Sequence, residues 1–146
     1  MFIYLLPLIT SAMWGLSAVL DKMAMVDMPM YLVFLIGALL YTITAVIVLF
    51  VNYKDLQLQI KLNKISYKSY IYAILAALTG FTIANLIYYY SLKKIDKPHI
   101  VACIAYTAPI FAFIFGLLLL NHKFSMYSLI GVIITVIGVI IVSSNL

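Results

Sequence analysis

The side chains best suited to binding a small molecule lie inside apolar stretches of this sequence, where polar groups are uncommon. Asn85 is the most polar of them. Thr82 and Tyr89 stand three residues before and four residues after it, so a helix would place all three on one face. An amide surrounded by hydrocarbon needs hydrogen-bond partners. We therefore expect Asn85 to face protein or a cavity rather than lipid.

Two aromatic residues lie at a similar depth in other apolar stretches. With a helical rise of about 1.5 Å per residue, Tyr106 lies about 12 Å, Asn85 about 10 Å and Trp14 about 9 Å from one membrane surface. Tyrosine and tryptophan at the headgroups form interfacial belts, and these two lie too deep for that role. We predict that the substrate-binding residues are Trp14, Thr82, Asn85, Tyr89 and Tyr106.

A proline stands near the middle of the apolar stretch that contains Tyr106. Pro109 has no N–H to donate to the carbonyl of Ala105, and its ring pushes that carbonyl aside. An unpaired carbonyl in lipid is costly unless a neighbouring helix, water or ligand satisfies it. The kink should therefore face protein or a cavity. Bending for packing and shaping of a cavity both remain open as its purpose.

No set of residues in the sequence is suited to catalysis or metal binding. His99 and His122 stand at the ends of apolar stretches without the spacing of metal ligands, and no Ser-His-Asp set, phosphate-binding loop or pair of carboxylates occurs. Cys103 is the single cysteine and lies in an apolar run, where we expect it to pack. We expect no enzyme activity, no cofactor and no metal.

The composition identifies lipid as the surroundings of these residues. Of the 146 residues, 67% are hydrophobic and only 9% are charged, too few to cover a water-soluble domain. The net charge of +5 comes from lysine and aspartate alone, because the sequence has no arginine and no glutamate. Arginine binds phosphates and bases through its forked guanidinium group, and the sequence has no arginine, so we do not expect a nucleic-acid partner. Lysine-rich loops are instead typical of contact with anionic headgroups.

Five apolar segments, separated by polar breaks, are each long enough to cross the bilayer as a helix. They run over about 2–20, 31–51, 70–92, 98–120 and 124–144. We predict an all-α integral membrane protein, a bundle of five transmembrane helices in one domain. Apolar and polar residues alternate from Leu56 to Leu62 in the longest connection, which is strand periodicity. We favour a lysine-rich segment at the headgroups there over a functional hairpin.

Five spans place the two ends of the chain on opposite sides of the membrane. The loops on the side of the amino terminus carry five lysines and those on the other side carry four. A lopsided lysine and arginine count normally sets the orientation. A count this even leaves both a single orientation and dual insertion open.

Two further groups of residues have candidate roles. Gly131, Thr135 and Gly138 form a stripe of small residues in the last segment, and such stripes let helices approach closely. We predict helix packing or a dimer contact there. Asp21 and Lys22 follow the first segment; they either mark its polar end or, if that helix is tilted, lie at the mouth of a cavity.

These features together resemble one family. The stretch "YYYSLKKIDKPHIVACIAYTAPIFAFIFGLLLLNHKFSMYSLIGVIITVIGVIIVSS" is similar to the second half of an EamA domain of the drug/metabolite transporter superfamily, where a helix with a central proline precedes a short polar turn and a Gly-patterned last helix. The stretch "AMWGLSAVLDKMAM" resembles the opening helix, with its Trp-Gly pair and following lysine. The resemblance covers nearly the whole chain and implies one five-helix repeat.

The resemblance also implies a second half, because members usually carry two repeats inverted relative to each other. A second copy of this chain could supply it, and the even lysine count allows an antiparallel homodimer. The turn Asn121 to Lys123 lacks the glutamate that the family often has there. The related small multidrug resistance proteins couple export to protons through an embedded glutamate, so that scheme does not carry over.

We therefore predict half of a transporter for small metabolites, a facilitator or exchanger that works as a dimer in the cell (inner) membrane. Its solutes should be amino-acid-like or otherwise neutral or zwitterionic, because no buried charge is available to pair with a net ion. The alternatives are a non-transporting assembly or accessory subunit bound through the Gly131 stripe, and a flippase for a lipid-linked sugar.

Overall fold

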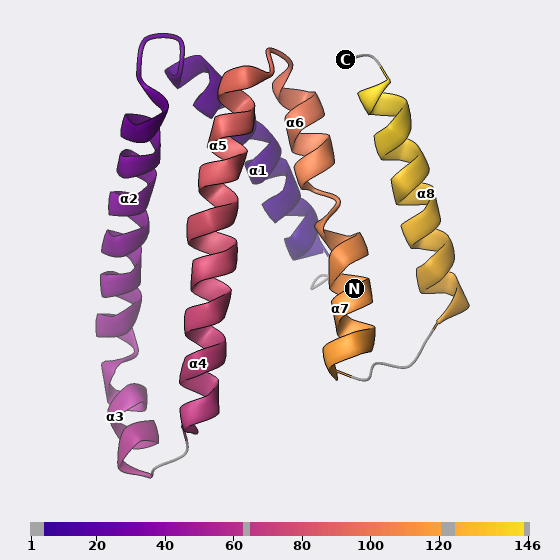
Figure 1. Ribbon diagram of the computed structural model, residues 1–146. Coiled ribbons are helices and arrows are strands. Elements are labelled where there is room, and N and C mark those ends of the chain that lie inside the picture. Colours follow the sequence, from indigo (N-terminus) through magenta and orange to yellow (C-terminus); the bar gives the residue numbers. More distant parts are fainter. Residues whose placement is uncertain (1–4, 63–64, 121–124, 145–146) are drawn as a thin grey trace. The chain divides into compact units, whose positions relative to one another are not determined.

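The structure, a computed structural model, describes residues 5–62, 65–120 and 125–144, and every element in these ranges is a helix. In chain order the elements are α1 (Leu5–Ala24), α2 (Met30–Val51), α3 (Tyr53–Lys61), α4 (Tyr67–Ala76), the π-helix η2 (Ala77–Ile83), α5 (Ala84–Lys94), α6 (Pro98–Ala105), α7 (Ala108–Leu120) and α8 (Met126–Ser143) (Figure 1). The all-α class is confirmed. The turn Asn121–Lys123, with His122, lies outside the described residues.

Four stretches of helix are long and apolar enough to cross a membrane. They are Met30–Val51, Tyr67–Lys94, Pro98–Leu120 and Met126–Ser143, and they overlap the second to fifth predicted spans. Helix α1 overlaps the first predicted span, but its described part also carries Asp21 and Lys22 and is not among the four. A chain with four such helices is a multi-pass membrane protein.

The chain divides into two compact units. The first consists of Met1–Lys22 with Lys94–Leu146, and the second of Met23–Lys93. In the first unit α8 packs against α6 and α7, and α6 contributes the buried side chains Ile100, Val101 and Ala102. Many other large apolar side chains are exposed, which is the arrangement expected where lipid rather than water surrounds the helices.

The third span, Tyr67–Lys94, stays continuous although its middle is a π-helix (Figure 1). Gly80 lies within η2, and glycine weakens an α-helix by about 1 kcal/mol relative to alanine. The Thr79 hydroxyl donates to the carbonyl of Leu75 at 2.8 Å, and the Thr82 hydroxyl donates to that of Ala77, five residues earlier, at 3.4 Å. Single π-turns inside α-helices occur frequently at functional sites.

The fourth span, Pro98–Leu120, is broken rather than bent. Helix α6 ends at Ala105 and α7 begins at Ala108, so Tyr106 and Thr107 form a turn between them. The Thr107 hydroxyl closes the turn by donating to the carbonyl of Ile104 at 2.8 Å. Pro109 is the second residue of α7, where a backbone N–H would have no helical partner in any case. The distortion expected at Pro109 is therefore a division of the span into two helices.

The strand periodicity in the connection after α2 predicted the wrong local structure, because these residues form the helix α3. The same sequence also satisfies helical spacing, since Tyr53, Leu56 and Ile60 recur at intervals of three and four residues. The hydroxyl of Tyr53 accepts a hydrogen bond from Gln57 Nε2 at 2.9 Å, one turn later. A helix satisfies its own backbone groups, whereas a lone strand would need a neighbour.

Candidate functional site

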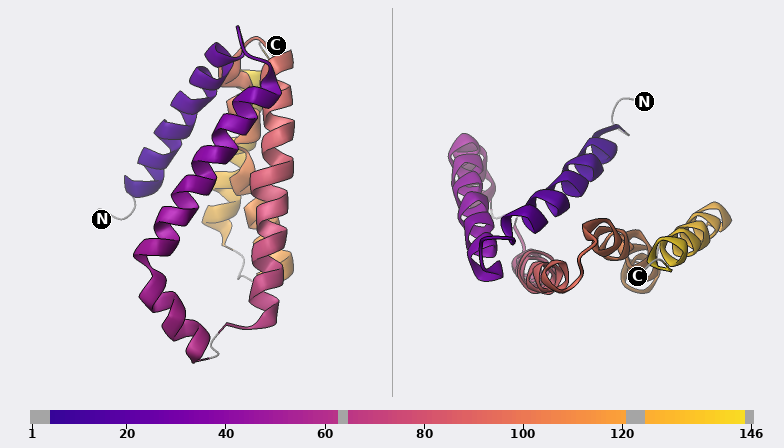
Figure 2. Two further views of the ribbon diagram at one scale, coloured as in Figure 1. Left: turned by 90° about the vertical axis from the view of Figure 1, so that its left-hand side faces the viewer. Right: turned by 90° about the horizontal axis from the view of Figure 1, so that it is seen from above.

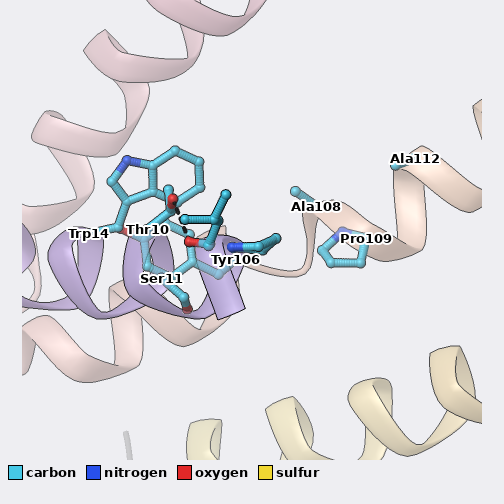
Figure 3. A pocket seen from close by; sticks show the side chains of 9 residues that line it. Thr10, Ser11, Trp14, Tyr106, Ala108, Pro109 and Ala112 are labelled. Atoms are coloured by element: carbon cyan, nitrogen blue, oxygen red, sulfur yellow. Dashed lines mark hydrogen bonds between the residues drawn. The ribbon is translucent and has the colours of Figure 1, made fainter. Parts of the chain in front are cut away.

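A cavity of about 740 Å³, open on one side and lined mostly by exposed residues, lies in the first unit beside the break between α6 and α7 (Figure 3). Nine residues line it: Leu6, Pro7, Thr10, Ser11, Trp14, Tyr106, Ala108, Pro109 and Ala112. Pockets that bind small molecules in proteins have volumes of roughly 300–1,000 Å³. The space is therefore large enough for a small organic solute.

One face of α1 forms the first wall of the cavity. Pro7, Thr10, Ser11 and Trp14 follow one another at intervals of three, one and three residues, which brings them to the same side of a helix. The Thr10 hydroxyl donates to the carbonyl of Leu6 at 3.1 Å (Figure 3). Its oxygen keeps lone pairs that can accept a hydrogen bond from a solute.

A stacked aromatic pair joins α1 to the turn between α6 and α7. The ring centroids of Trp14 and Tyr106 lie 5.6 Å apart, with an angle of 23° between the ring planes. Such pairs contribute about 0.5–1.5 kcal/mol beyond the area that they bury. Trp14 nevertheless remains 55% exposed, so part of its indole is open to the cavity. The structure thus brings two of the predicted binding residues into contact.

The start of α7 forms the second wall, and its side chains are small. Ala108, Pro109 and Ala112 face the cavity (Figure 3). The N–H of Ile110, the residue after Pro109, donates to the carbonyl of Thr107 at 2.8 Å. None of the nine lining residues is charged. The walls therefore offer apolar and aromatic surface with a few hydroxyl and indole groups.

A second hollow, of about 490 Å³, lies in the second unit between α2 and η2. Its lining residues are Phe34, Ala38, Tyr41, Thr44, Ala45, Val48, Phe81 and Thr82. The rings of Tyr41 and Phe81 meet edge to face, with centroids 6.2 Å apart. Thr82, predicted from the sequence as a binding residue, belongs to this hollow.

Asn85 and Tyr89 lie on α5, beyond η2. Asn85 Nδ2 donates to the carbonyl of Phe81 at 2.9 Å, so its own helix supplies a partner for the amide. The ring of Tyr89 meets that of Phe34 edge to face, with centroids 6.0 Å apart. Trp14 and Tyr106 belong to the first unit, whereas Thr82, Asn85 and Tyr89 belong to the second. A single cavity shared by all five predicted residues therefore stays a prediction.

The pair Asp21 and Lys22 is engaged at the end of α1. Lys22 Nζ donates to the carbonyl of Ile95 at 2.8 Å and lies 3.6 Å from Asp96 Oδ1, while Asp21 accepts a hydrogen bond from Ser17 at 3.3 Å. The two contacts of Lys22 tie α1 to the turn before α6. Neither Asp21 nor Lys22 is among the residues that line the cavity.

The stripe of small residues on α8 has open space beside it. A Cβ atom added at Gly131 or at Gly138 would meet no other atom within 4 Å. The Thr135 hydroxyl donates to the carbonyl of Gly131 at 2.9 Å, so the polar group of the stripe is satisfied within the helix. Another helix could therefore approach this surface closely.

The sequence interpretation missed most of the α1 wall. Pro7, Thr10 and Ser11 share the helical face of Trp14, so the spacing could have identified them once Trp14 was chosen. Ala108 and Ala112 carry no such signal. Small apolar residues are common in spanning helices, and only the position of the break gives these two a role.

Comparison with known proteins identifies a family. The model of the EamA-like transporter family matches residues 1–144, a range that includes every helix of the described chain. The comparisons with curated proteins and with solved structures give no match.

Proposed function

Because the chain belongs to the EamA-like transporter family, we propose that it carries small neutral or zwitterionic solutes across the membrane and has no catalytic activity. The cavity beside the helix break would be the binding site. The lining of the cavity is the observation that carries this proposal. It consists of an aromatic pair and small apolar side chains, with hydroxyl groups and without a charged residue. Such walls offer no counter-ion to a solute with a net charge. Amino acids and similar metabolites fit.

The broken span supports movement at this site. Helix α6 carries buried side chains, whereas most of α7 is exposed, and only Tyr106 and Thr107 join them. A span that is interrupted beside a cavity can change its shape at the interruption while each half stays helical. No carboxylate lines the cavity. We therefore propose a facilitator or exchanger rather than a proton-driven pump.

The functional unit that we propose is a homodimer in the cell (inner) membrane, with five spans in each copy. Helix α1 would be the fifth span, in addition to the four that length and composition identify. The open stripe at Gly131, Thr135 and Gly138 is the proposed dimer surface. An antiparallel partner would complete a pair of inverted repeats.

Uptake into vesicles tests the transport proposal. Purified protein reconstituted into vesicles should take up at least one member of a panel of labelled neutral amino acids faster than empty vesicles do. Trp14→Ala should lower that rate about tenfold, because the stacking surface is lost. Trp14→Phe, the matched control, keeps a ring and should keep most of the rate. The absence of uptake for the whole panel, or equal rates for Trp14→Ala and wild type, would overturn the proposal.

A non-transporting assembly subunit is the second candidate, and the open surface of α8 favours it. A double variant Gly131→Leu with Gly138→Leu should break association under either function, because the side chains would hold a neighbouring helix away. Trp14→Ala separates the two functions, since it should lower uptake about tenfold but leave assembly unchanged. Cross-linking in membranes measures assembly in both variants.

A further inference from the structure

Helix α3 begins where a membrane-crossing helix ends. Asn52 is the only residue between α2 and α3, and its backbone turns with φ −102° and ψ 14°. Its side-chain Nδ2 donates to the carbonyl of Val48 at 2.8 Å, while its own carbonyl accepts from the N–H of Leu56 at 3.0 Å. Figure 2 shows α3 turning away from the axis of α2 at this point. The geometry places α3 directly at the end of a span.

The residues of α3 separate into an apolar and a basic face. At about 100° per residue, Tyr53, Leu56 and Ile60 share one side of the helix. Lys54 and Lys61 are two turns apart and lie roughly 80–160° around the helix from these three residues, on a side that also carries Leu58. No residue of α3 is buried, and Ile60 is 58% exposed. Tyr53 and Ile60 of the apolar face are therefore open within the described chain, whereas Leu56 is partly covered.

The charge around α3 is strongly positive. Residues 52–69 contain four lysines and one acidic residue, Asp55; Lys64 lies outside the described residues. Among the described residues, neither Lys54 nor Lys61 has an ion-pair partner. Asp27, the other acidic residue of the second unit, precedes the opposite end of α2. Apart from Asp55, no acidic residue of the second unit thus lies near the basic face.

We propose that α3 is an interfacial helix that binds anionic phospholipid headgroups of the bilayer that the protein itself crosses. Tyr53, Leu56 and Ile60 would enter the boundary between headgroups and acyl chains, and Lys54 and Lys61 would contact the phosphates. A short helix with a basic polar face at the end of a span is suited to this position. The inference concerns lipid recognition and does not depend on the proposed transport.

The first part of the test compares two positions on opposite faces of α3. Leu56→Cys and Leu58→Cys are made separately in the full chain with Cys103→Ser, so that each variant has one thiol and has lost one leucine. Both proteins are reconstituted into vesicles of phosphatidylcholine with phosphatidylglycerol and treated with a water-soluble maleimide. Leu58→Cys should react at least tenfold faster than Leu56→Cys. Equal rates would overturn the proposal.

The second part asks whether the headgroup charge matters. Protection of Leu56→Cys should be stronger in vesicles with phosphatidylglycerol than in phosphatidylcholine alone, by about fivefold for each contributing lysine, and 0.5 M salt should reduce the difference. Lys54→Gln with Lys61→Gln should remove this lipid dependence. Lys93→Gln with Lys94→Gln, a matched loss of two charges elsewhere, should keep it.

The remaining outcomes decide between lipid and protein as the partner. If Leu56→Cys is equally protected in both lipids and the α3 lysines have no effect, protein or uncharged lipid covers the apolar face and the proposal is wrong. If both lysine pairs reduce the lipid dependence equally, only the net charge of the protein matters and specific binding by α3 is excluded. Loss of the effect in the α3 variant alone supports the proposal.

Discussion

The third and fourth spans both depart from a regular α-helix near their middle, but they do so in opposite ways. In Tyr67–Lys94 the threonine hydroxyls and the Asn85 amide donate to carbonyls of their own helix, and the span widens into η2 without interruption. In Pro98–Leu120 a proline lacks its donor, and the helix stops and starts again. Both spans have threonine hydroxyls that donate to their own carbonyls, so the proline is the difference that accompanies the division of the fourth span.

The two spans also differ in the size of the hollow that lies beside each distortion. The break in the fourth span turns Tyr106 toward Trp14 and leaves the larger cavity next to Pro109. The π-helix of the third span borders the smaller hollow through Phe81 and Thr82. We conclude that the broken span is the better candidate for the binding site, and the following variants test this difference.

The largest effect is expected for Pro109→Ala. Alanine restores an N–H and favours a helix, so α6 and α7 should join through Tyr106 and Thr107 and close the cavity. Uptake should fall more than tenfold, while thermal stability should not decrease. Hydrogen exchange at Thr107 should become slower as the turn becomes helical.

Pro98→Ala is the matched control for this change. Pro98 is the first residue of α6, where the missing N–H has no partner and alanine changes little. Uptake and exchange should stay close to wild type. If Pro109→Ala behaves like Pro98→Ala in both measurements, the break does not depend on Pro109 and the contrast between the spans has another cause.

A smaller loss of uptake, about three- to tenfold, is expected for Asn85→Leu. The carbonyl of Phe81 loses one donor, which changes stability little because the backbone of the same helix can still pair with it. Any marked loss of uptake must then come from lost contact with solute, and it would extend the binding site to the third span. Wild-type uptake would restrict the site to the broken span. Asn52→Leu, which removes another amide that donates to its own helix, is the control for stability.

Thr79→Val should affect only the local structure of the third span. It removes the hydroxyl that donates to Leu75 and keeps the branched shape of the side chain. We expect a change in unfolding free energy of about 1 kcal/mol or less. Hydrogen exchange within 77–83 should change, whereas exchange at Thr107 should not. A change at both sites would show that the two distortions are linked.

The smallest effect is expected for Gly37→Ala on α2, which faces the third span. An added Cβ would lie 3.7 Å from the Tyr89 hydroxyl, an ordinary van der Waals contact, and alanine favours a helix. The change in unfolding free energy should be within about 0.5 kcal/mol of zero or slightly stabilising. A loss above about 2 kcal/mol would mean that α2 and α5 pack more tightly than these distances indicate.

Composition and segment length were sufficient to predict the helical membrane fold, because few other structures satisfy the backbone of such apolar segments in lipid. They were not sufficient to predict where a span is interrupted. Pro109 indicated a distortion, but a proline tolerates either a bend or a helix start, and the break falls at Tyr106 and Thr107. The π-helix has no comparable signal, since glycine and threonine are common in regular spanning helices.

The candidate site was partly predictable. Trp14 and Tyr106 stood out because large aromatic rings deep in the bilayer need a neighbour, and the two rings do stack. Asn85 stood out for its polarity, but polarity does not reveal whether the partner is a solute or the residue's own helix. The hydrogen bond from Asn85 to Phe81 answers part of that question. Periodicity likewise failed at α3, where the same residues satisfy both a strand and a helix.

The contact between Lys22 and Ile95 has a consequence for protein engineering. The residues between them comprise the whole second unit and Lys94, so the chain leaves the first unit and returns to it at points joined by a 2.8 Å hydrogen bond. The second unit is thus arranged as an insertion whose two ends meet, a layout that domain transplantation tolerates well. A short glycine linker from Lys22 to Ile95 would replace the second unit and keep all nine lining residues of the cavity in one shortened chain.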